Sequence, residues 1–387
     1  MATDMNVTAL GGPGAMGRAT TRELAENERI DELLIADANL EAAEGFAEEV
    51  RASEYTGTIE TAKVDVTDHE ELVSTIEDSA VVANALPYAF NVTVMEACLE
   101  AGCHYLDLGG LYHETQNQLE LDEAFRDVEL TAVLGIGASP GMTNVAAAMG
   151  AERLDEVSRI HIRTGAKGGG EGFAYSAKTI LDELTMDPVV YRDGQYETLD
   201  PLSGRETYEM PDPVGEVEGF HSIHSELATM PEVFYGVETV DFRVAFSPDL
   251  VNICEVLIGL NLTSEEPVEY KGVETTPREF LDWHLDNQPK PGAVEEWKSF
   301  RVDVHGIEDG EAAHYRYTVV VESRLDDWGL KATAVWTGVP MGVAADVVGR
   351  GDALATGAKP PEAALDPSSF IDELMKRGIH IEEVKIE

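Results

Sequence analysis

The first 145 residues alternate short apolar runs with longer stretches in which apolar residues recur every three or four positions. A short apolar run is typical of a buried strand, and the longer period is typical of an amphipathic helix. The predicted strands are residues 6–10, 33–36, 61–66, 80–86, 104–108 and 132–136. The helices between them are expected to end near residues 28, 51, 77, 101 and 128. This alternation predicts a doubly wound parallel sheet of the Rossmann type.

The pattern changes after about residue 150. Apolar and polar residues now alternate singly, which predicts a mainly antiparallel sheet with one covered face. The expected strands are residues 159–163, 239–246, 256–262 and 315–322. Residues 193–218 are rich in Asp, Glu, Gly and Pro and are expected to form surface loops, whereas 343–350 and 368–377 are expected to be helical. The predicted fold class is α/β, with a Rossmann domain at 1–145, an α+β domain at 146–336 and a helical segment at 337–387.

A glycine-rich turn directly follows the first predicted strand and opens a helix, with the sequence Gly12-Pro13-Gly14-Ala15-Met16-Gly17. In a dinucleotide site the first glycine permits the tight turn, the second lets pyrophosphate approach the backbone, and the third lets helix and strand pack closely. Free N–H groups and the helix dipole hold the phosphates. Asp37 ends the second strand twenty residues later, where a carboxylate binds the ribose hydroxyls. An ordinary strand–helix turn is the alternative interpretation.

The residues around Asp37 also bear on the choice of cofactor. Asp37 would repel a 2′-phosphate, and neither Ala38 nor Asn39 offers a cation to bind one. The sequence therefore predicts NAD rather than NADP. Asp65 and Val66, at the end of the third strand, are placed to flank the adenine. Asp65 is equally suited to cap the following helix, and both interpretations stay open.

The chain is strongly acidic, with 27 Lys and Arg against 74 Asp and Glu and a formal net charge of −47. Such self-repulsion is screened in abundant salt, where the Debye length falls to about 3 Å at 1 M. We therefore expect a protein from a salt-accumulating halophile, with an acidic mesophilic protein as the alternative. The charge argues against nucleic acid or anionic membrane as partner. Three cysteines, no long apolar span and no signal-like N-terminus predict a cytoplasmic protein.

Several further motifs resemble those of the saccharopine dehydrogenase family, in the reductase branch that includes lysine 6-dehydrogenases and carboxynorspermidine dehydrogenases. They are Asp65-Val66-Thr67-Asp68, Leu86-Pro87-Tyr88, Tyr105-Leu106-Asp107, Ser139-Pro140-Gly141-Met142-Thr143-Asn144 and Lys359-Pro360-Pro361-Glu362. The resemblance covers nearly the whole chain and is densest before residue 150. It implies that residues 337–387 pack back onto the first domain and that the second domain pairs subunits into a homodimer.

The resemblance also implies an activity. It implies an NAD(P)-dependent oxidoreductase that acts on a C–N bond of a lysine-like amino acid or its conjugate, a small-molecule amine. The alternatives are a saccharopine or carboxynorspermidine dehydrogenase proper, or an NAD-binding sensor that has lost its chemistry. Two departures from the family motivate the sensor. The segment Phe173-Ala174-Tyr175-Ser176 lacks a tryptophan, and Ser139, Thr143 and Asn144 stand in place of an acidic residue and an acid–His pair.

Site residues follow from the same resemblance. Leu86, Pro87 and Tyr88 match the loop beside the nicotinamide ribose, and Asp107 with the turn of Ser139, Pro140 and Asn144 matches segments lining the cleft. Oxidation of an amine benefits from a general base, for which Asp107 and Tyr88 are the candidates. A capped loop carboxylate is the alternative for Asp107. The substrate-binding candidates are Tyr175, His224 and Arg243, the last as a partner for a carboxylate or as a surface salt bridge. No third ligand accompanies His221 and His224, so no metal is expected.

Overall fold

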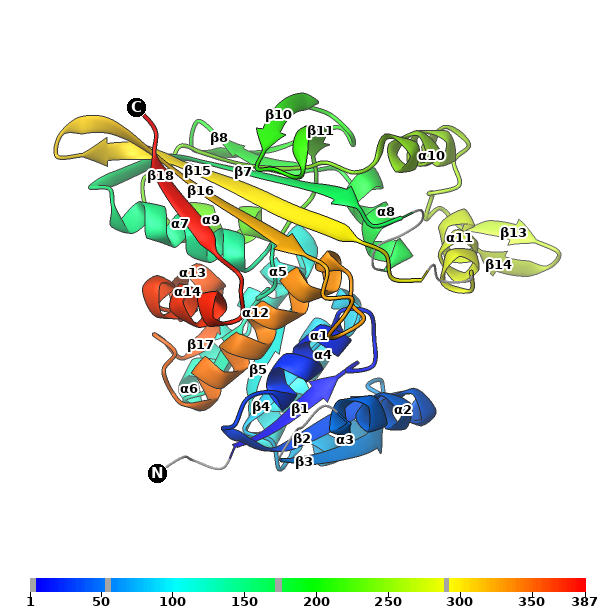
Figure 1. Cartoon of the computed structure of the whole chain (residues 1–387). Helices are drawn as coiled ribbons and strands as arrows, with labels where there is room; N and C mark the ends of the chain where they lie inside the picture. Colours follow the sequence, from blue (N-terminus) through cyan, green and yellow to red (C-terminus); the bar gives the residue numbers. More distant parts are fainter. Residues whose placement is uncertain (1–4, 53–56, 171–175, 289–291) are drawn as a thin grey trace.

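The computed structural model describes residues 5–52, 57–170, 176–288 and 292–387, which form two sheets with helices packed on and between them (Figure 1). The first is a parallel seven-stranded sheet in the order β17-β6-β5-β4-β1-β2-β3. Its strands are β1 Met5–Leu10, β2 Ile30–Asp37, β3 Thr58–Lys63, β4 Val81–Asn84, β5 His104–Asp107, β6 Thr131–Val133 and β17 Gly357–Lys359. The strand order reverses between β1 and β4, which confirms the predicted doubly wound sheet.

The helices of this domain begin and end at recognisable local signals. They are α1 Gly17–Ala25, α2 Leu40–Arg51, α3 His69–Ile76, α4 Asn91–Ala101, α5 Leu111–Leu119 and α6 Asp122–Asp127. Asn39 caps α2 by accepting from the Ala42 N–H at 3.2 Å, and Gly102 ends α4 with a φ of 79°. The prediction of a single helix ending near residue 128 is wrong, because the helix is interrupted at residues 120–121 and two helices, α5 and α6, form instead.

The second sheet has nine strands in the order β10-β11-β12-β7-β15-β16-β18, with β8 and β9 joined to it through β12. The strands are β7 Glu156–Gly168, β8 Val189–Arg192, β9 Gln195–Thr198, β10 Glu206–Met210, β11 Gly215–His221, β12 Thr239–Val244, β15 Glu296–Glu308, β16 Glu311–Glu322 and β18 Ile381–Lys385. Its strand pairs are antiparallel apart from β12 with β7, which confirms the mainly antiparallel sheet.

Two predictions in this domain are wrong. Residues 193–218 are not surface loops, because β9, β10 and the start of β11 are strands at the polar edge of the sheet. The strand expected at 256–262 is instead largely helix α10, Pro248–Gly259. Ser247 caps α10, and its buried Val251 and Cys254 stand three residues apart, which is a helical spacing. A hairpin of β13 Val268–Tyr270 and β14 Val273–Thr275 then leads to α11, Pro277–Asp286.

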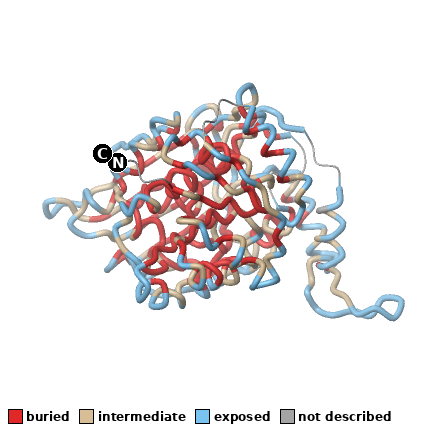
Figure 2. The backbone as a smooth tube through the Cα atoms, turned by 90° about the horizontal axis from the view of Figure 1, so that it is seen from below, coloured by how far each residue is buried: buried red, intermediate tan, exposed pale blue. Residues whose placement is uncertain are grey.

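This hairpin and α11 project from the body as an arm (Figure 1). Figure 2 shows buried residues throughout the body and few along the arm. Large apolar side chains are therefore exposed there, with Tyr270 63% and Trp283 61% accessible.

The C-terminal segment, for which packing back onto the first domain is expected, lies largely against that domain. Helix α12, Ala332–Gly349, contacts both sheets and packs closely on α1, where a Cβ at Gly338 would lie 2.6 Å from the Cβ of Ala19. Strand β17 pairs with β6, and α13 Pro361–Ala364 and α14 Pro367–Lys376 pack against α7, Met142–Glu152. The last strand departs from this expectation, because β18 pairs with β16 of the second sheet. Within the described ranges, no helix has the length and apolar character of a membrane span.

Candidate active site

The glycine loop lies between β1 and α1 at the carboxyl end of the parallel sheet. The Gly14 N–H donates to the Gly11 carbonyl at 2.9 Å, and a Cβ added at Gly14 would lie 2.9 Å from that same oxygen. At Gly17 the corresponding distance is 2.2 Å, and a Cβ at Gly12 would lie 2.9 Å from Ile35. The loop therefore needs its three glycines for its own packing. No side chain caps α1, and the N–H groups of Arg18 and Ala19 donate within the turn, to the carbonyls of Gly14 at 3.0 Å and Met16 at 3.1 Å. The positive end of the helix dipole adjoins the loop, as in a pyrophosphate site.

Asp37 ends β2 and is half-buried, with one carboxylate oxygen accepting from the Asn39 N–H at 2.8 Å. The strand register places Lys63 beside Asp37. Lys63 is therefore a cation near Asp37, although the sequence neighbours of Asp37 include none. Asp65 is exposed and accepts from the Thr67 N–H at 3.0 Å. The cap of α3 is Asp68, so Asp65 closes the preceding turn rather than capping the helix. Val66 packs beside it on the core of the first domain.

A buried amide network fixes the loop after β4. The Leu86 N–H donates to the Asn84 side chain at 3.2 Å, and the Asn84 amide donates to the Tyr105 hydroxyl at 3.1 Å. Leu86, Pro87 and Tyr88 consequently line one cavity with Ala15 and Met16. The Tyr88 hydroxyl donates to Asp182 at 2.7 Å, and burial together with this carboxylate raises the pKa of Tyr88. The phenol stays protonated, so the structure does not support Tyr88 as a general base.

Asp107 is fully buried at the end of β5, and groups of the chain itself occupy its carboxylate. One oxygen accepts from the N–H groups of Gly109 at 2.7 Å and Gly135 at 2.8 Å, and the other accepts from the Gln118 amide at 2.5 Å. Burial raises the pKa of Asp107. Its neighbours Leu108 and Gly109 line the cavity, whereas Asp107 does not. This geometry favours the alternative interpretation of Asp107, a capped loop carboxylate that positions two loops, over a general base or a cofactor ligand.

The cavity has a volume of about 410 Å³ and lies where the glycine loop meets the second sheet. Its walls combine Ser139 and Pro140 with Phe242 and Val244 of β12 and Trp336 of α12. A second cavity of about 420 Å³ adjoins it, and both are lined by Ala245, Phe246 and Lys298. Together the two cavities form a long site, one end of which lies at the Leu86–Tyr88 loop.

His224 lines this cavity and forms a buried pair with Glu226 behind it. The Nδ1 atom of His224 contacts one oxygen of Glu226, and the ring stacks on Phe242 with centroids 3.9 Å apart. The other Glu226 oxygen accepts from the hydroxyls of Ser139 at 2.6 Å and Thr143 at 2.8 Å. Burial opposes charge on the imidazole, but Glu226 raises the pKa of His224 above its ordinary value. Burial likewise opposes the charge of Glu226, but His224 and the two hydroxyls lower its pKa.

Asn144 holds the adjoining turn rather than facing the cavity. Its amide oxygen accepts from the Gly141 N–H at 2.9 Å, and its amide nitrogen donates to Glu362 of α13 at 2.8 Å. The other Glu362 oxygen accepts from the Thr229 hydroxyl at 2.6 Å. Burial raises the pKa of Glu362 to about 7. A residue near the end of the chain thus fixes the turn that presents Ser139.

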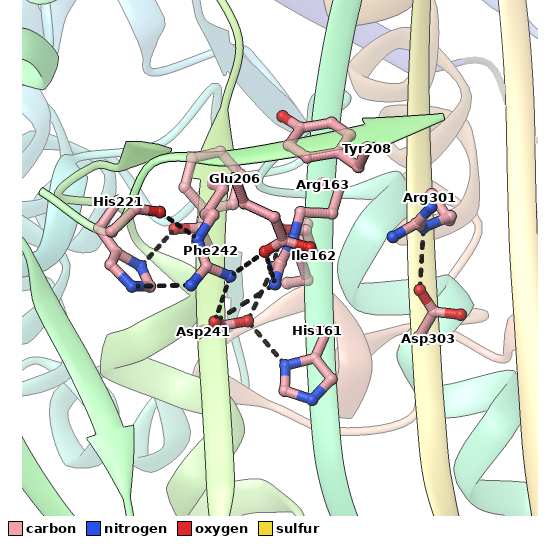
Figure 3. Close-up of polar contacts among 12 residues, drawn as sticks. His161, Ile162, Arg163, Glu206, Tyr208, His221, Asp241, Phe242, Arg301 and Asp303 are labelled. Carbon is pink, nitrogen blue, oxygen red and sulfur yellow. Dashed lines mark hydrogen bonds and ion pairs between the residues drawn. The ribbon is translucent and has the colours of Figure 1, made fainter. Parts of the chain in front are cut away.

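Phe242 and Val244 line the cavity, so Arg243, which lies between them on β12, faces the opposite side of the sheet. Figure 3 shows its partners Asp241 and Glu206. Its guanidinium pairs with Asp241 at 2.7 Å and Glu206 at 2.8 Å, and Nε donates to the Gly204 carbonyl at 2.9 Å. The structure therefore gives Arg243 the alternative role, a salt bridge, and not that of a substrate ligand. Tyr175 lies outside the described residues.

Much of the cavity wall was not predicted from the sequence, including the charged residues Glu183 and Lys298 and the aromatic Trp336. Each stands alone in its helix or strand, with no motif around it. Within the described ranges, no group of three or more His, Cys, Asp or Glu side chains is arranged to hold a metal ion.

Comparisons with known proteins agree with this geometry. Residues 7–133 match the saccharopine dehydrogenase NADP binding domain, and residues 137–379 match the saccharopine dehydrogenase C-terminal domain. The chain is 26% identical over 396 residues to carboxyaminopropylagmatine dehydrogenase of Synechocystis sp., with 96% of each chain covered. It is 26% identical over 407 residues to carboxynorspermidine synthase of Vibrio alginolyticus, with 97% of this chain and 96% of the relative covered. A saccharopine dehydrogenase (L-Glu forming) from Saccharomyces cerevisiae has the same fold, with a TM-score of 0.75 and 16% sequence identity. The match covers 99% of this chain and 100% of that chain.

Proposed function

The chain belongs to the saccharopine dehydrogenase family and is an NAD(P)-dependent oxidoreductase, and we propose that it interconverts an imine and a carboxylated secondary amine. The observation that carries the proposal is the His224–Glu226 pair, whose imidazole lines the same cavity as the glycine loop and the Leu86–Tyr88 loop. An acid–base group beside a nicotinamide is what reduction of an imine requires.

The named relatives favour this substrate class over free lysine. They are a carboxyaminopropylagmatine dehydrogenase and a carboxynorspermidine synthase, and the chain matches them over nearly their whole length. Both names describe amines that carry a carboxyalkyl group. The two adjoining cavities, of about 410 and 420 Å³, provide room for such an elongated molecule.

A bound nicotinamide would supply the hydride chemistry at the reacting carbon. The glycine loop and the start of α1 would hold its pyrophosphate, and the apolar walls around Phe242 and Trp336 would exclude water. Glu226 occupies Nδ1 of His224 and leaves Nε2 available to the substrate. His224 takes the proton from the substrate amine before oxidation and returns it to the nitrogen during reduction. Glu226 fixes the tautomer and stabilises the imidazolium.

We also propose NAD as the preferred cofactor. Asp37 stands where the ribose hydroxyls bind, and its charge opposes a 2′-phosphate. Lys63, beside Asp37 in the register, moderates that repulsion, so the preference is expected to be one of degree.

The working state we propose is a homodimer in concentrated salt. The net charge of −47 supports the salt requirement, and the exposed aromatic residues of the arm support association.

Nicotinamide absorbance in molar KCl tests the proposed function. The purified enzyme is mixed with NAD or NADP and a panel containing lysine, saccharopine and carboxynorspermidine. We expect reduction of the cofactor with the carboxylated secondary amines, faster with NAD. Binding of NAD without turnover of any secondary amine would contradict the proposal.

A further inference from the structure

Lys298 lies on the wall shared by the two cavities. Side chains alternate between the two faces along β15, so Lys298 shares its face with the buried Phe300 and Val302. Arg301 and Asp303 point to the opposite face, where they pair with one another at 2.9 Å. Lys298 is therefore a cation placed in an apolar row that borders the site.

No carboxylate of the described residues lies within 4.0 Å of the Lys298 ammonium. Lys178, Lys359, Lys376 and Lys385 form ion pairs, whereas Lys298 forms none among the described residues although it lies on a cavity wall. The charged neighbour of its strand, Glu296, instead accepts from the Thr333 N–H at 2.6 Å. The ammonium lies over the ring of Trp336, with the centroid 5.7 Å away.

A desolvated cation without a partner is costly, and an anionic ligand removes that cost. Burial lowers the pKa of Lys298, although Glu296 and Glu183 oppose this effect. A carboxylate brought by a ligand would reverse that shift and keep the ammonium charged. The cavity itself thus presents a cation that its own protein leaves unpaired.

We propose that Lys298 binds the carboxylate of the substrate, an inference that rests on the proposed function. The reacting C–N bond then lies in the first cavity beside His224, and the carboxylate lies at the junction of the two cavities. The remainder of the amine extends into the second cavity. Lys298, on the other face of the sheet, thus takes the carboxylate-binding role that was expected of Arg243. Amines without a carboxylate bind more weakly because they leave the half-buried Lys298 charge without a carboxylate partner.

Calorimetry in molar KCl tests this assignment with pairs of ligands that differ by one carboxylate. The NAD-loaded enzyme is titrated with carboxynorspermidine and norspermidine, and with lysine and cadaverine. We expect wild type to prefer carboxynorspermidine to norspermidine by about 30- to 100-fold, as a charge-assisted contact allows. Lys298→Met should abolish that preference, whereas Lys298→Arg should retain most of it. Lys271→Met, which removes an exposed lysine of the arm, is the control for loss of one positive charge.

Each other outcome has a distinct meaning. Equal preference in Lys298→Met and wild type, with melting temperatures showing both folded, would overturn the assignment. Wild type that binds both members of a pair equally would overturn it too, while the hydride-transfer activity stands. Wild type that binds neither pair and turns over no secondary amine would show that the proposed substrate class is wrong. Retained turnover in Lys298→Arg excludes a general-base role, because arginine stays protonated.

Discussion

Glu226→Gln is the sharpest test of the acid–base pair. The substitution preserves the shape of the side chain and removes its charge. In the native site, Glu226 contacts His224 and accepts from Ser139 at 2.6 Å and Thr143 at 2.8 Å. Its carboxylate is the main group that offsets the burial opposing an imidazolium at His224, and Glu183 adds a smaller effect in the same direction. Without it, burial prevails and the pKa of His224 falls.

The kinetic consequence has a defined sign. Amine oxidation requires neutral His224, so kcat/KM rises with pH through the pKa of that group. In Glu226→Gln this acidic limb should move to lower pH. The plateau should fall by about 10²–10³-fold, because a weaker base accepts the amine proton less readily.

The assay is the pH profile of kcat/KM for oxidation of a carboxylated secondary amine in molar KCl. Glu206→Gln is the matched control, since Glu206 is also ion-paired but lies with Arg243 on the outer face of the sheet. An unmoved limb and an unchanged plateau in Glu226→Gln would refute the role of the pair. A change of equal size in the Glu206 control would show a general electrostatic effect instead.

Three further substitutions have defined outcomes. Asp37→Ala should weaken NAD binding by about tenfold and narrow the preference over NADP; an unchanged ratio of the two affinities would contradict the ribose contact. Asp107→Asn should lower the free energy of unfolding by about 1–3 kcal/mol, seen as a lower melting temperature, and leave kcat within a few-fold of wild type. A kcat that falls by orders of magnitude while stability stays intact would instead support Asp107 as a base. The pKa of Glu362 rises from 4.5 in the unfolded chain to about 7 in the fold, so ionisation destabilises the native state progressively between these pH values. Glu362→Gln should therefore gain up to about 3 kcal/mol above pH 7 and nothing near pH 4; denaturant titrations that give the same difference at both pH values would contradict this.

Local sequence signals explain how far the first domain was predictable. The strand, the glycine turn and the helix lie within one short segment, and the steric need for Gly14 and Gly17 arises from Gly11 beside them. Helix α2 has its predicted bounds because its cap, Asn39, adjoins it. Where a signal lies within one turn or strand, sequence is sufficient.

For Arg243, the alternation of apolar and charged residues along its strand already indicates the face on which it lies. Val240, Phe242 and Val244 alternate with Asp241 and Arg243 along β12, so the apolar set faces the cavity and the charged set faces outward. That period of two already places Arg243 away from an apolar-walled site.

Asp107 and Lys298 show where sequence is insufficient. A carboxylate at the end of a parallel strand has the same local pattern whether it binds a ligand or caps its own loops. The distinction depends on Gln118 and Gly135, which the fold brings to Asp107. Lys298 becomes a cavity residue only because β15 lies beside β7 and α12 supplies Trp336.

Transfer of labelled hydride tests the central claim most directly. The enzyme in molar KCl receives nicotinamide cofactor deuterated at the transferring position, together with the imine of a carboxylated amine, and the product is analysed by mass spectrometry. The account predicts one deuterium on the carbon bonded to the secondary nitrogen in wild type, and a large loss of that product in His224→Gln. Deuterium at another carbon, or full labelling in His224→Gln, would contradict it.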